Sequence, residues 1–143
     1  MTPTPPEPRT ISDAGEFGLI GDITRRLAMP PSVSVGPGDD AAVFLVNGSA
    51  VITVDMIVEG HDFRRDWSSP ADVGHKAVAG SVADIESMGA RPTIMVIGLG
   101  APAGLEYLWV KEFMTGVREE ADLAGVALVG GDMATAPQIT ISV

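Results

Sequence analysis

Apolar residues recur at helical spacing in two stretches of the chain. From about residue 105 to residue 124 they mark one helix face, and Gly125 directly after them suits a helix end. The members of this face are Leu105, Trp109, Phe113, Val117 and Ala121. A shorter pattern predicts a first helix from about residue 13 to residue 28, with Asp13 and Glu16 as a capping pair. Its apolar members are Phe17, Ile20, Ile23 and Leu27.

A further helix is predicted to begin after Ser68 or Ser69 and to stop at Gly89. Pro70 and Asp72 suit its first turn. This stretch is apolar nearly all round, which predicts burial on two sides. Asp84 lies inside it, and a buried charge is costly unless it is paired or bound to a metal. The alternative is a carboxylate satisfied by backbone donors at a turn.

Short apolar runs between the helices predict strands. They cover residues 42–46, 51–54, 93–99, 126–129 and 138–143. Asn47-Gly48 lies between the first two, and this dipeptide is a strong signal for a hairpin turn. The order of elements predicts an α+β fold, a mixed sheet with helices on one face. Runs 51–54 and 93–99 are apolar at consecutive positions, so the other face also needs cover. We therefore expect a homodimer formed through the sheet.

Acidic residues gather in short clusters. Besides Asp84, these are Gly38-Asp39-Asp40, Thr53-Val54-Asp55 and Gly130-Gly131-Asp132. In the predicted hairpin Asp40 faces Asp55, and like charges in that position destabilise a sheet unless cations lie between them. Mg²⁺ takes oxygen ligands and usually binds substrate phosphates as well. The clusters therefore point to metal-assisted phosphate chemistry, although an isolated Gly-Gly-Asp is more often a simple turn.

Composition narrows the class of protein. We expect one domain over residues 13–143, after a flexible proline-rich tail over residues 1–12. The net charge of −10 leaves no basic stripe for nucleic acid. No apolar run reaches the roughly 18 residues of a membrane span. The chain has no cysteine, which excludes disulfides and thiol catalysis and suits a cytoplasmic protein.

Seven motifs, in order and at compatible spacings over about residues 15–143, resemble those of the thiamine-monophosphate kinase family. They are Gly15-Glu16-Phe17, Gly38-Asp39-Asp40-Ala41-Ala42, Thr53-Val54-Asp55-Met56, Val58-Glu59-Gly60, Lys76-Ala77, Asp84 with Met88-Gly89-Ala90, and Leu128-Val129-Gly130-Gly131-Asp132. The resemblance implies a kinase that transfers the γ-phosphoryl group of ATP onto thiamine monophosphate, giving thiamine diphosphate. It also implies the fold of the superfamily that includes aminoimidazole ribonucleotide synthetase, whose N-terminal domain dimerises through its sheet.

The resemblance also implies roles for single residues. Several Mg²⁺ ions would be held by Asp40, Thr53, Asp55, Asp84, Asp132 and the carbonyl of Val54, where the family usually has threonine. Gly131 and Asp132 would contact ATP. No protein acid, base or nucleophile is implied, because the metals would align the phosphates in line. The family's substrate histidine directly precedes a phenylalanine. Here Asp62 stands at that place and His61 one position earlier, so both are substrate candidates, although an exposed loop histidine is the alternative for His61.

The resembling family has a second domain of comparable size, and this chain stops at Val143 within a predicted strand. We therefore expect the N-terminal half of an enzyme, inactive as an isolated domain. Two alternatives stay open. One is another ATP-dependent synthetase of the superfamily, in purine biosynthesis or selenophosphate synthesis; the latter generally needs a reactive cysteine or selenocysteine, which this chain does not contain. The other is a non-catalytic module for dimerisation or nucleotide binding.

Overall fold

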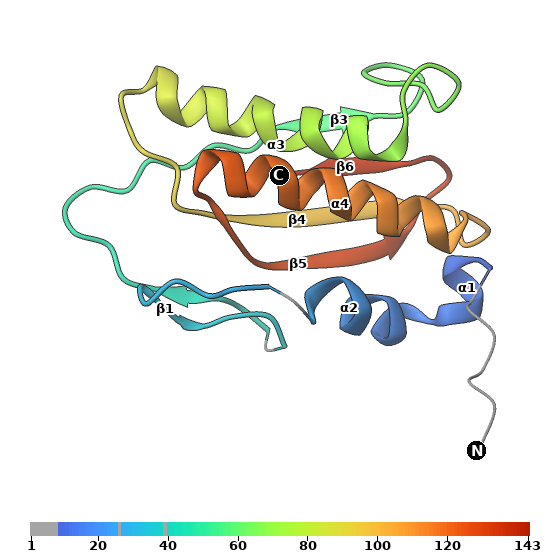
Figure 1. Ribbon diagram of the computed structural model, residues 1–143, viewed down its shortest axis with the longest axis horizontal. Coiled ribbons are helices and arrows are strands. Elements are labelled where there is room, and N and C mark those ends of the chain that lie inside the picture. Colours follow the sequence, from blue (N-terminus) through green and yellow to red (C-terminus); the bar gives the residue numbers. More distant parts are fainter. Residues whose placement is uncertain (1–8, 26, 39) are drawn as a thin grey trace.

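The computed structural model describes residues 9–25, 27–38 and 40–143. Its centre is a four-stranded sheet in the order β3-β6-β4-β5 (Figure 1). The strands are β3 (Met56–Val58), β4 (Ile94–Ala101), β5 (Ala127–Thr135) and β6 (Thr140–Ser142). Strands β4 and β5 are parallel, whereas β6 is antiparallel to both β3 and β4. The predicted α+β fold with a mixed sheet is therefore confirmed.

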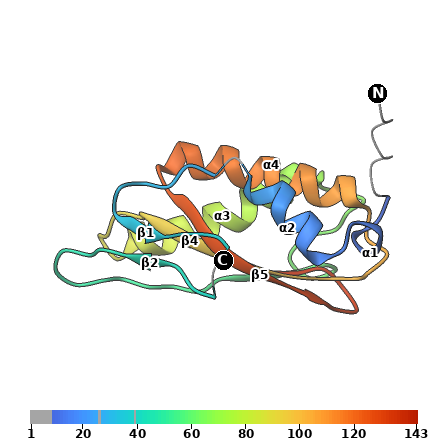
Figure 2. The ribbon, with the colours of Figure 1, turned by 90° about the horizontal axis from the view of Figure 1, so that it is seen from below.

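Two long helices, α3 (Pro70–Ser87) and α4 (Tyr107–Ala124), cover one face of this sheet. Figure 2 shows both on the same side of the strands. Beneath them the sheet buries alternate residues, among them Ile57, Leu99 and Ile141. On the opposite face the intervening residues are open, and Met56 and Val96 are 54% and 53% exposed. The open face of the sheet is therefore partly apolar.

The ends of both long helices agree with the sequence prediction. Ser69 caps α3, its hydroxyl accepts from the Asp72 amide, and the Asp72 carboxylate accepts from the Ser69 amide. Helix α4 ends at Gly125, whose φ of 67° lies in the left-handed region that favours glycine. All five residues of the stripe predicted for α4 are buried. Local capping and apolar spacing were sufficient to define these helices.

Helices α3 and α4 pack closely because glycines face the partner helix. A Cβ atom at Gly74 would overlap the Phe113 carbonyl oxygen and lie 2.7 Å from the Val117 amide nitrogen. At Gly116 a Cβ would overlap the backbone of Ala71. The two helix backbones therefore touch directly, and any side chain larger than hydrogen at either glycine would push them apart.

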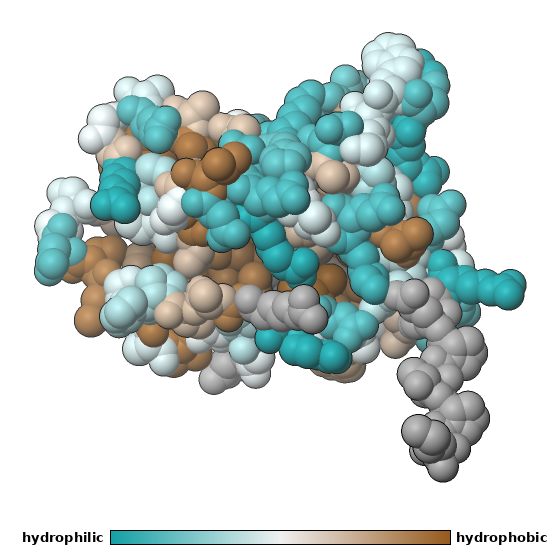
Figure 3. All heavy atoms as spheres, in the orientation of Figure 1, coloured by the Kyte–Doolittle hydropathy of each residue, from teal (hydrophilic) through white to brown (hydrophobic). Residues whose placement is uncertain are grey.

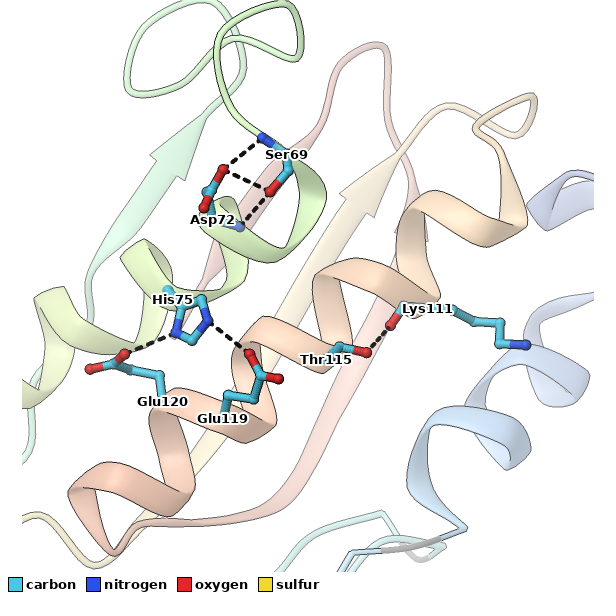
Figure 4. Close-up of polar contacts among 7 residues, drawn as sticks. All are labelled: Ser69, Asp72, His75, Lys111, Thr115, Glu119 and Glu120. Carbon is cyan, nitrogen blue, oxygen red and sulfur yellow. Dashed lines mark hydrogen bonds and ion pairs between the residues drawn. The ribbon is translucent and has the colours of Figure 1, made fainter.

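His75 of α3 bridges to two glutamates of α4 at the solvent side of the interface between these helices (Figure 4). The Nδ1 atom of His75 lies 3.0 Å from the Glu120 carboxylate, and Nε2 lies 3.0 Å from the Glu119 carboxylate. Both ring nitrogens donate only in the imidazolium form. The hydrogen bond to Glu120, opposed by partial burial and assisted by Glu119, raises the pKa of His75. The charged form of His75 therefore joins α3 to α4.

The first predicted helix is divided in two. Helix α1 (Ile11–Ala14) and helix α2 (Glu16–Thr24) are separated by Gly15, whose φ is 69°. The predicted pairing of Asp13 with Glu16 is wrong, because Asp13 instead forms a capping box with Thr10. The predicted stripe is also only partly right, since Phe17 is 86% exposed and Leu19 is the fully buried residue. Glycine at the junction changed the direction of the chain and therefore the buried face.

Helix α2 is fixed to α4 by polar contacts. The buried Tyr107 hydroxyl donates to the Asp22 carboxylate, which lowers the pKa of Asp22. Arg118 donates to the Ile23 carbonyl at 2.7 Å. Together with the burial of Leu19, these contacts hold α2 beside β5, the edge strand of the sheet.

The predicted hairpin around Asn47-Gly48 is wrong. Strand β2 (Val43–Phe44) pairs with β1 (Val33–Val35) in a separate two-stranded sheet. Residues 51–54 form no strand, and the chain joins the main sheet only at Asp55, whose backbone exchanges hydrogen bonds with Val143 at 3.0 and 2.9 Å. The local turn signal was outweighed by two other pairings: β2 pairs with β1, earlier in the chain, and Asp55 pairs with Val143, much later in it.

Residues 1–8 of the tail predicted over 1–12 lie outside the described residues. The rest of that stretch is held against the start of α4. The Arg9 carbonyl accepts from the Tyr107 amide, and the Ile11 amide donates to the Leu105 carbonyl, both at 3.0 Å. No helix among the described residues is long and apolar enough to cross a membrane.

Candidate functional site

A cavity of about 360 Å³ lies where α2, α4, β5 and the segment between β1 and β2 meet. Its apolar lining includes Leu27, Phe113 and Met114. Figure 3 shows hydrophobic atoms at the surface in the band between the helical body and the β1–β2 pair. Two acidic residues, Asp40 and Asp132, also line the cavity, and both are exposed. The arrangement combines an apolar interior with carboxylates in contact with water.

Gly130, Gly131 and Asp132 lie inside β5 and not at a turn. A Cβ atom at Gly131 would overlap the carbonyl oxygen of Ile97 in the neighbouring strand, so the chain requires glycine there. The register of β4 and β5 shifts between Met95 and Val96, which marks a bulge just before these glycines. Such irregularities re-aim side chains beside functional sites. Asp132 pairs with Gly98 and has no bulky neighbour directly across the ladder.

A second polar group lies at the far edge of the sheet, over α3. The Thr53 hydroxyl donates to the Asp84 carboxylate at 3.2 Å. Asp55 lies over Gly80, four residues before Asp84 on the same helix, and residues four apart share a helix face. The Met56 amide donates to Oδ1 of Asp55 at 2.8 Å. The structure therefore brings together three of the residues singled out from the sequence: Thr53, Asp55 and Asp84.

Asp84 is exposed, so the prediction that its helix is buried on two sides is wrong. The buried residues of α3 are Val73, Gly74, Ala77 and Val78, all in its first half. In the second half of the helix the side chains are partly buried or exposed. Asp84 is therefore in contact with water and is not a buried charge.

The two acidic groups lie apart. Asp55 lies level with Val143. In the adjacent row of the sheet, Ser142 pairs with Gly98, and Gly98 pairs with Asp132 on β5, next to Gly131. Since β3 and β5 are the two edges, this row spans three strand spacings of about 4.8 Å, roughly 14 Å. Among the described residues, no three histidine or acidic side chains are close enough to hold one ion. The predicted facing of Asp40 and Asp55 is wrong, because the hairpin on which it depended does not form. Asp39 lies outside the described residues.

The remaining predicted site residues lie in or near β3. Val54 is 73% exposed and lies just before the chain joins the sheet. Asp62 accepts a hydrogen bond from the Val58 amide at 2.8 Å and its carbonyl accepts one from Lys76, which ties the turn to α3. His61 is exposed in the same turn. The structure gives Asp62 a local structural role and leaves the His61 ring in solvent.

Residues 38–143 match the family described as AIR synthase related protein, N-terminal domain. The chain belongs to this family. It is 44% identical over 96% of its length to a thiamine-monophosphate kinase of Mycobacterium tuberculosis, and 37% identical over 90% to one of Bacillus subtilis. It covers 41% and 40% of those two relatives. The chain thus spans about two fifths of the length of the curated relatives it matches.

Solved structures of the family have the same fold. A thiamine-monophosphate kinase from Stenotrophomonas maltophilia matches with a TM-score of 0.74 and 30% identity, over 90% of this chain and 41% of that one. A structure described as AaThiL complexed with AMPPCP and TMP matches with a TM-score of 0.61 and 28% identity, over 90% and 40%. Hydrogenase maturation protein HypE in complex with ATP matches with a TM-score of 0.73 and 25% identity, over 91% and 40%.

Sequence reasoning missed Gly80 and the cavity wall supplied by α2 and α4. Gly80 carried a usable signal, because it is a glycine in the interior of a helix on the face of Asp84. The cavity lining carried none, since Leu27, Phe113 and Met114 read as ordinary core residues. Only the docking of α2 against α4 turns their apolar surface into a cavity wall.

Proposed function

We propose that this chain provides ATP and Mg²⁺ binding for the phosphorylation of thiamine monophosphate to thiamine diphosphate. The observation that carries the proposal is that Asp40, Gly131 and Asp132 line one cavity with an apolar interior. The apolar wall suits a nucleotide base, and the backbone of Gly131 and the carboxylate of Asp132 suit metal-bound phosphates. The 44% identity to a thiamine-monophosphate kinase and the AMPPCP and TMP complex of a relative support the choice of reaction.

The donor atoms fit Mg²⁺. All the side chains concerned are oxygen donors, and hard divalent cations take oxygen ligands. The space over Gly80, which a Cβ atom would fill, holds the Asp55 carboxylate beside Asp84 and Thr53. In the proposal, Asp40 and Asp132 hold ions at the nucleotide, while Thr53, Asp55, Asp84 and the Val54 carbonyl hold ions on the other side of the phosphates. Bound there, Mg²⁺ would neutralise phosphate charge.

The chain's own residues would then orient and bind. Asp40 and Asp132 fix the phosphate end of the nucleotide, and the apolar wall around Met114 excludes water from the base. Asp62, and His61 beside it, would contact thiamine monophosphate. The Asp62 carboxylate is engaged by the Val58 amide at 2.8 Å, so it offers the substrate its remaining lone pairs from a fixed position.

We also propose that the protein is a cytoplasmic homodimer. Exposed apolar side chains continue from β2 through the irregular segment to the open face of the sheet. They are Val43, Phe44, Leu45, Val46, Val51, Ile52, Val54, Met56 and Val96. Contiguous apolar surface of this kind is uncommon on monomers. A second copy on the open face of the sheet is the occupant we propose.

Nucleotide binding can be tested on this chain directly. Its Tm should rise on addition of Mg²⁺ with a non-hydrolysable ATP analogue, and by less with either alone. Asp132→Asn should abolish most of the rise. Asp122→Asn is the matched control, because Asp122 is an exposed acid on α4 outside the cavity lining. An equal rise in both variants would refute the assignment of Asp132.

Phosphoryl transfer can be tested in a chimera. This chain would replace the corresponding 138 aligned residues of the Mycobacterium tuberculosis relative, and ADP release would be measured with thiamine monophosphate. ADP release that depends on thiamine monophosphate is expected. A chimera that folds and binds the ATP analogue but does not turn over would leave ATP binding in place and refute the substrate assignment. That outcome would favour a different ATP-dependent reaction, as the similarity to HypE allows.

A further inference from the structure

We propose that Gly80 is a positioning residue for metal binding, because its missing side chain sets where the Asp55 carboxylate lies. This inference rests on the proposed function, since it assumes that Asp55 and Asp84 bind a divalent cation. It concerns a residue that contacts no substrate and that has no role in capping α3 or in packing the core.

Gly80 lies in the interior of α3, where glycine is less favourable than alanine. Its backbone gives no reason for glycine, since Gly80 is not among the glycines with positive φ. Packing against other backbone gives none either. Among the described residues, a Cβ atom at Gly80 would meet only the Asp55 carboxylate, at 2.6 Å from Oδ2 and 3.8 Å from Cγ. By contrast, a Cβ at Gly74 in the same helix would collide with the backbone of α4.

The Asp55 carboxylate is thus held from two sides. The Met56 amide donates to Oδ1 at 2.8 Å, and Oδ2 rests in the space over Gly80. One helical turn further on, Asp84 accepts from the Thr53 hydroxyl at 3.2 Å. Gly80 therefore lets one carboxylate approach the helix surface on which the other stands. An alanine there would displace Oδ2 from this position and would leave the contact between Thr53 and Asp84 in place.

Gly80→Ala should separate stability from metal binding. Without metal, its Tm should rise by about 3 °C, because alanine favours the helix and only the end of a flexible side chain must move. Its affinity for Mn²⁺ should fall by about 10- to 100-fold, as is usual when the support of a metal ligand is removed. A residue with a purely structural role would change both in the same direction.

The experiment titrates this chain with Mn²⁺ alone, followed by electron paramagnetic resonance, and records Tm in parallel. Gly21→Ala is the matched control, because Gly21 lies in the interior of α2 and no atom of the described residues comes within 4 Å of its added Cβ. It should raise Tm by a similar amount and leave Mn²⁺ affinity unchanged. In an Asp55→Asn background, Gly80→Ala should cause no further loss of affinity.

The outcomes are distinct. Unchanged Mn²⁺ affinity in Gly80→Ala, with wild type binding the ion, would overturn the inference and leave the metal site standing. A further loss in the Asp55→Asn background would also overturn it, since Gly80 would then act through something other than Asp55. If wild type binds no Mn²⁺, both the inference and the metal part of the proposed function fail.

Discussion

Replacing Gly74 by alanine should weaken the protein by forcing α3 and α4 apart. The added Cβ would lie 2.7 Å from the Val117 amide nitrogen and would overlap the Phe113 carbonyl oxygen. Both atoms belong to the backbone of α4, so no side chain can rotate to relieve the contact. Reaching an ordinary separation requires the helices to part by about 1 Å, and a gap of that size forfeits a quarter to a half of each dispersion contact across it.

The magnitude follows from two opposing effects. Overpacking of this kind costs about 1–3 kcal/mol, at the upper end here because backbone must move. Alanine returns up to about 1 kcal/mol through its higher helix propensity. The net loss of stability should be about 2 kcal/mol, which corresponds to a fall in Tm of about 6 °C for a chain of this size.

Urea and thermal unfolding of Gly74→Ala, followed by circular dichroism, would measure this loss. Gly21→Ala serves as control, since the same substitution in α2 meets no described atom within 4 Å and should stabilise the protein. Equal Tm values for the two variants would contradict the claim that backbone contact between α3 and α4 dictates glycine. A stabilised Gly74→Ala would show that the two helices part without loss.

Three further predictions concern other contacts. The pKa of His75 is raised chiefly by Glu120, so its ion pair stabilises the protein fully just below the ordinary histidine pKa of about 6.5 and is lost as pH rises above it; the Tm advantage of wild type over His75→Gln should shrink from roughly pH 6.5 upward. Tyr107→Phe removes the hydroxyl that lowers the pKa of Asp22. The Tm advantage of wild type over this variant should therefore shrink as pH falls below about 4, and a constant difference would contradict the assignment. Val96→Asp places a charge on the open face of the sheet and should give a folded monomer in sedimentation equilibrium; monomeric wild type would refute the dimer.

The sequence predicts α3 and α4 well because their signals are local. Ser69, Asp72 and Gly125 act through neighbours within one helical turn, and these contacts form as expected. The α+β class follows from the same local order of elements. What the sequence predicts badly is the pairing of short strands, because a strand of two or three residues carries too little pattern to select a partner.

The candidate site shows the same limit. The resemblance grouped Asp40, Thr53, Asp55, Asp84 and Asp132 around one metal cluster. The structure brings Thr53, Asp55 and Asp84 together at α3 and leaves Asp132 on the other edge of the sheet, and the hairpin that was to bring Asp40 to Asp55 is absent. Asp55 reaches α3 because its backbone pairs with Val143, a contact that no local pattern announces. The separation of Asp132 from Asp55 depends on sheet order, which the sequence leaves open.

Sheet order also governs the sequence of folding events. Strand β6 lies between β3 and β4, and Ile57 of β3 pairs with Ile141, 84 positions later in the chain. Strand β4, helix α4 and strand β5 follow one another directly and close only short loops, whereas pairing of β3 with β6 requires a long loop to close first. The α4-covered half of the sheet can therefore assemble while β3 is still free. We therefore expect the segment with Thr53 and Asp55 to reach its position after β4 and β5 have paired, so that the surroundings of Asp132 form before this second group of oxygen ligands.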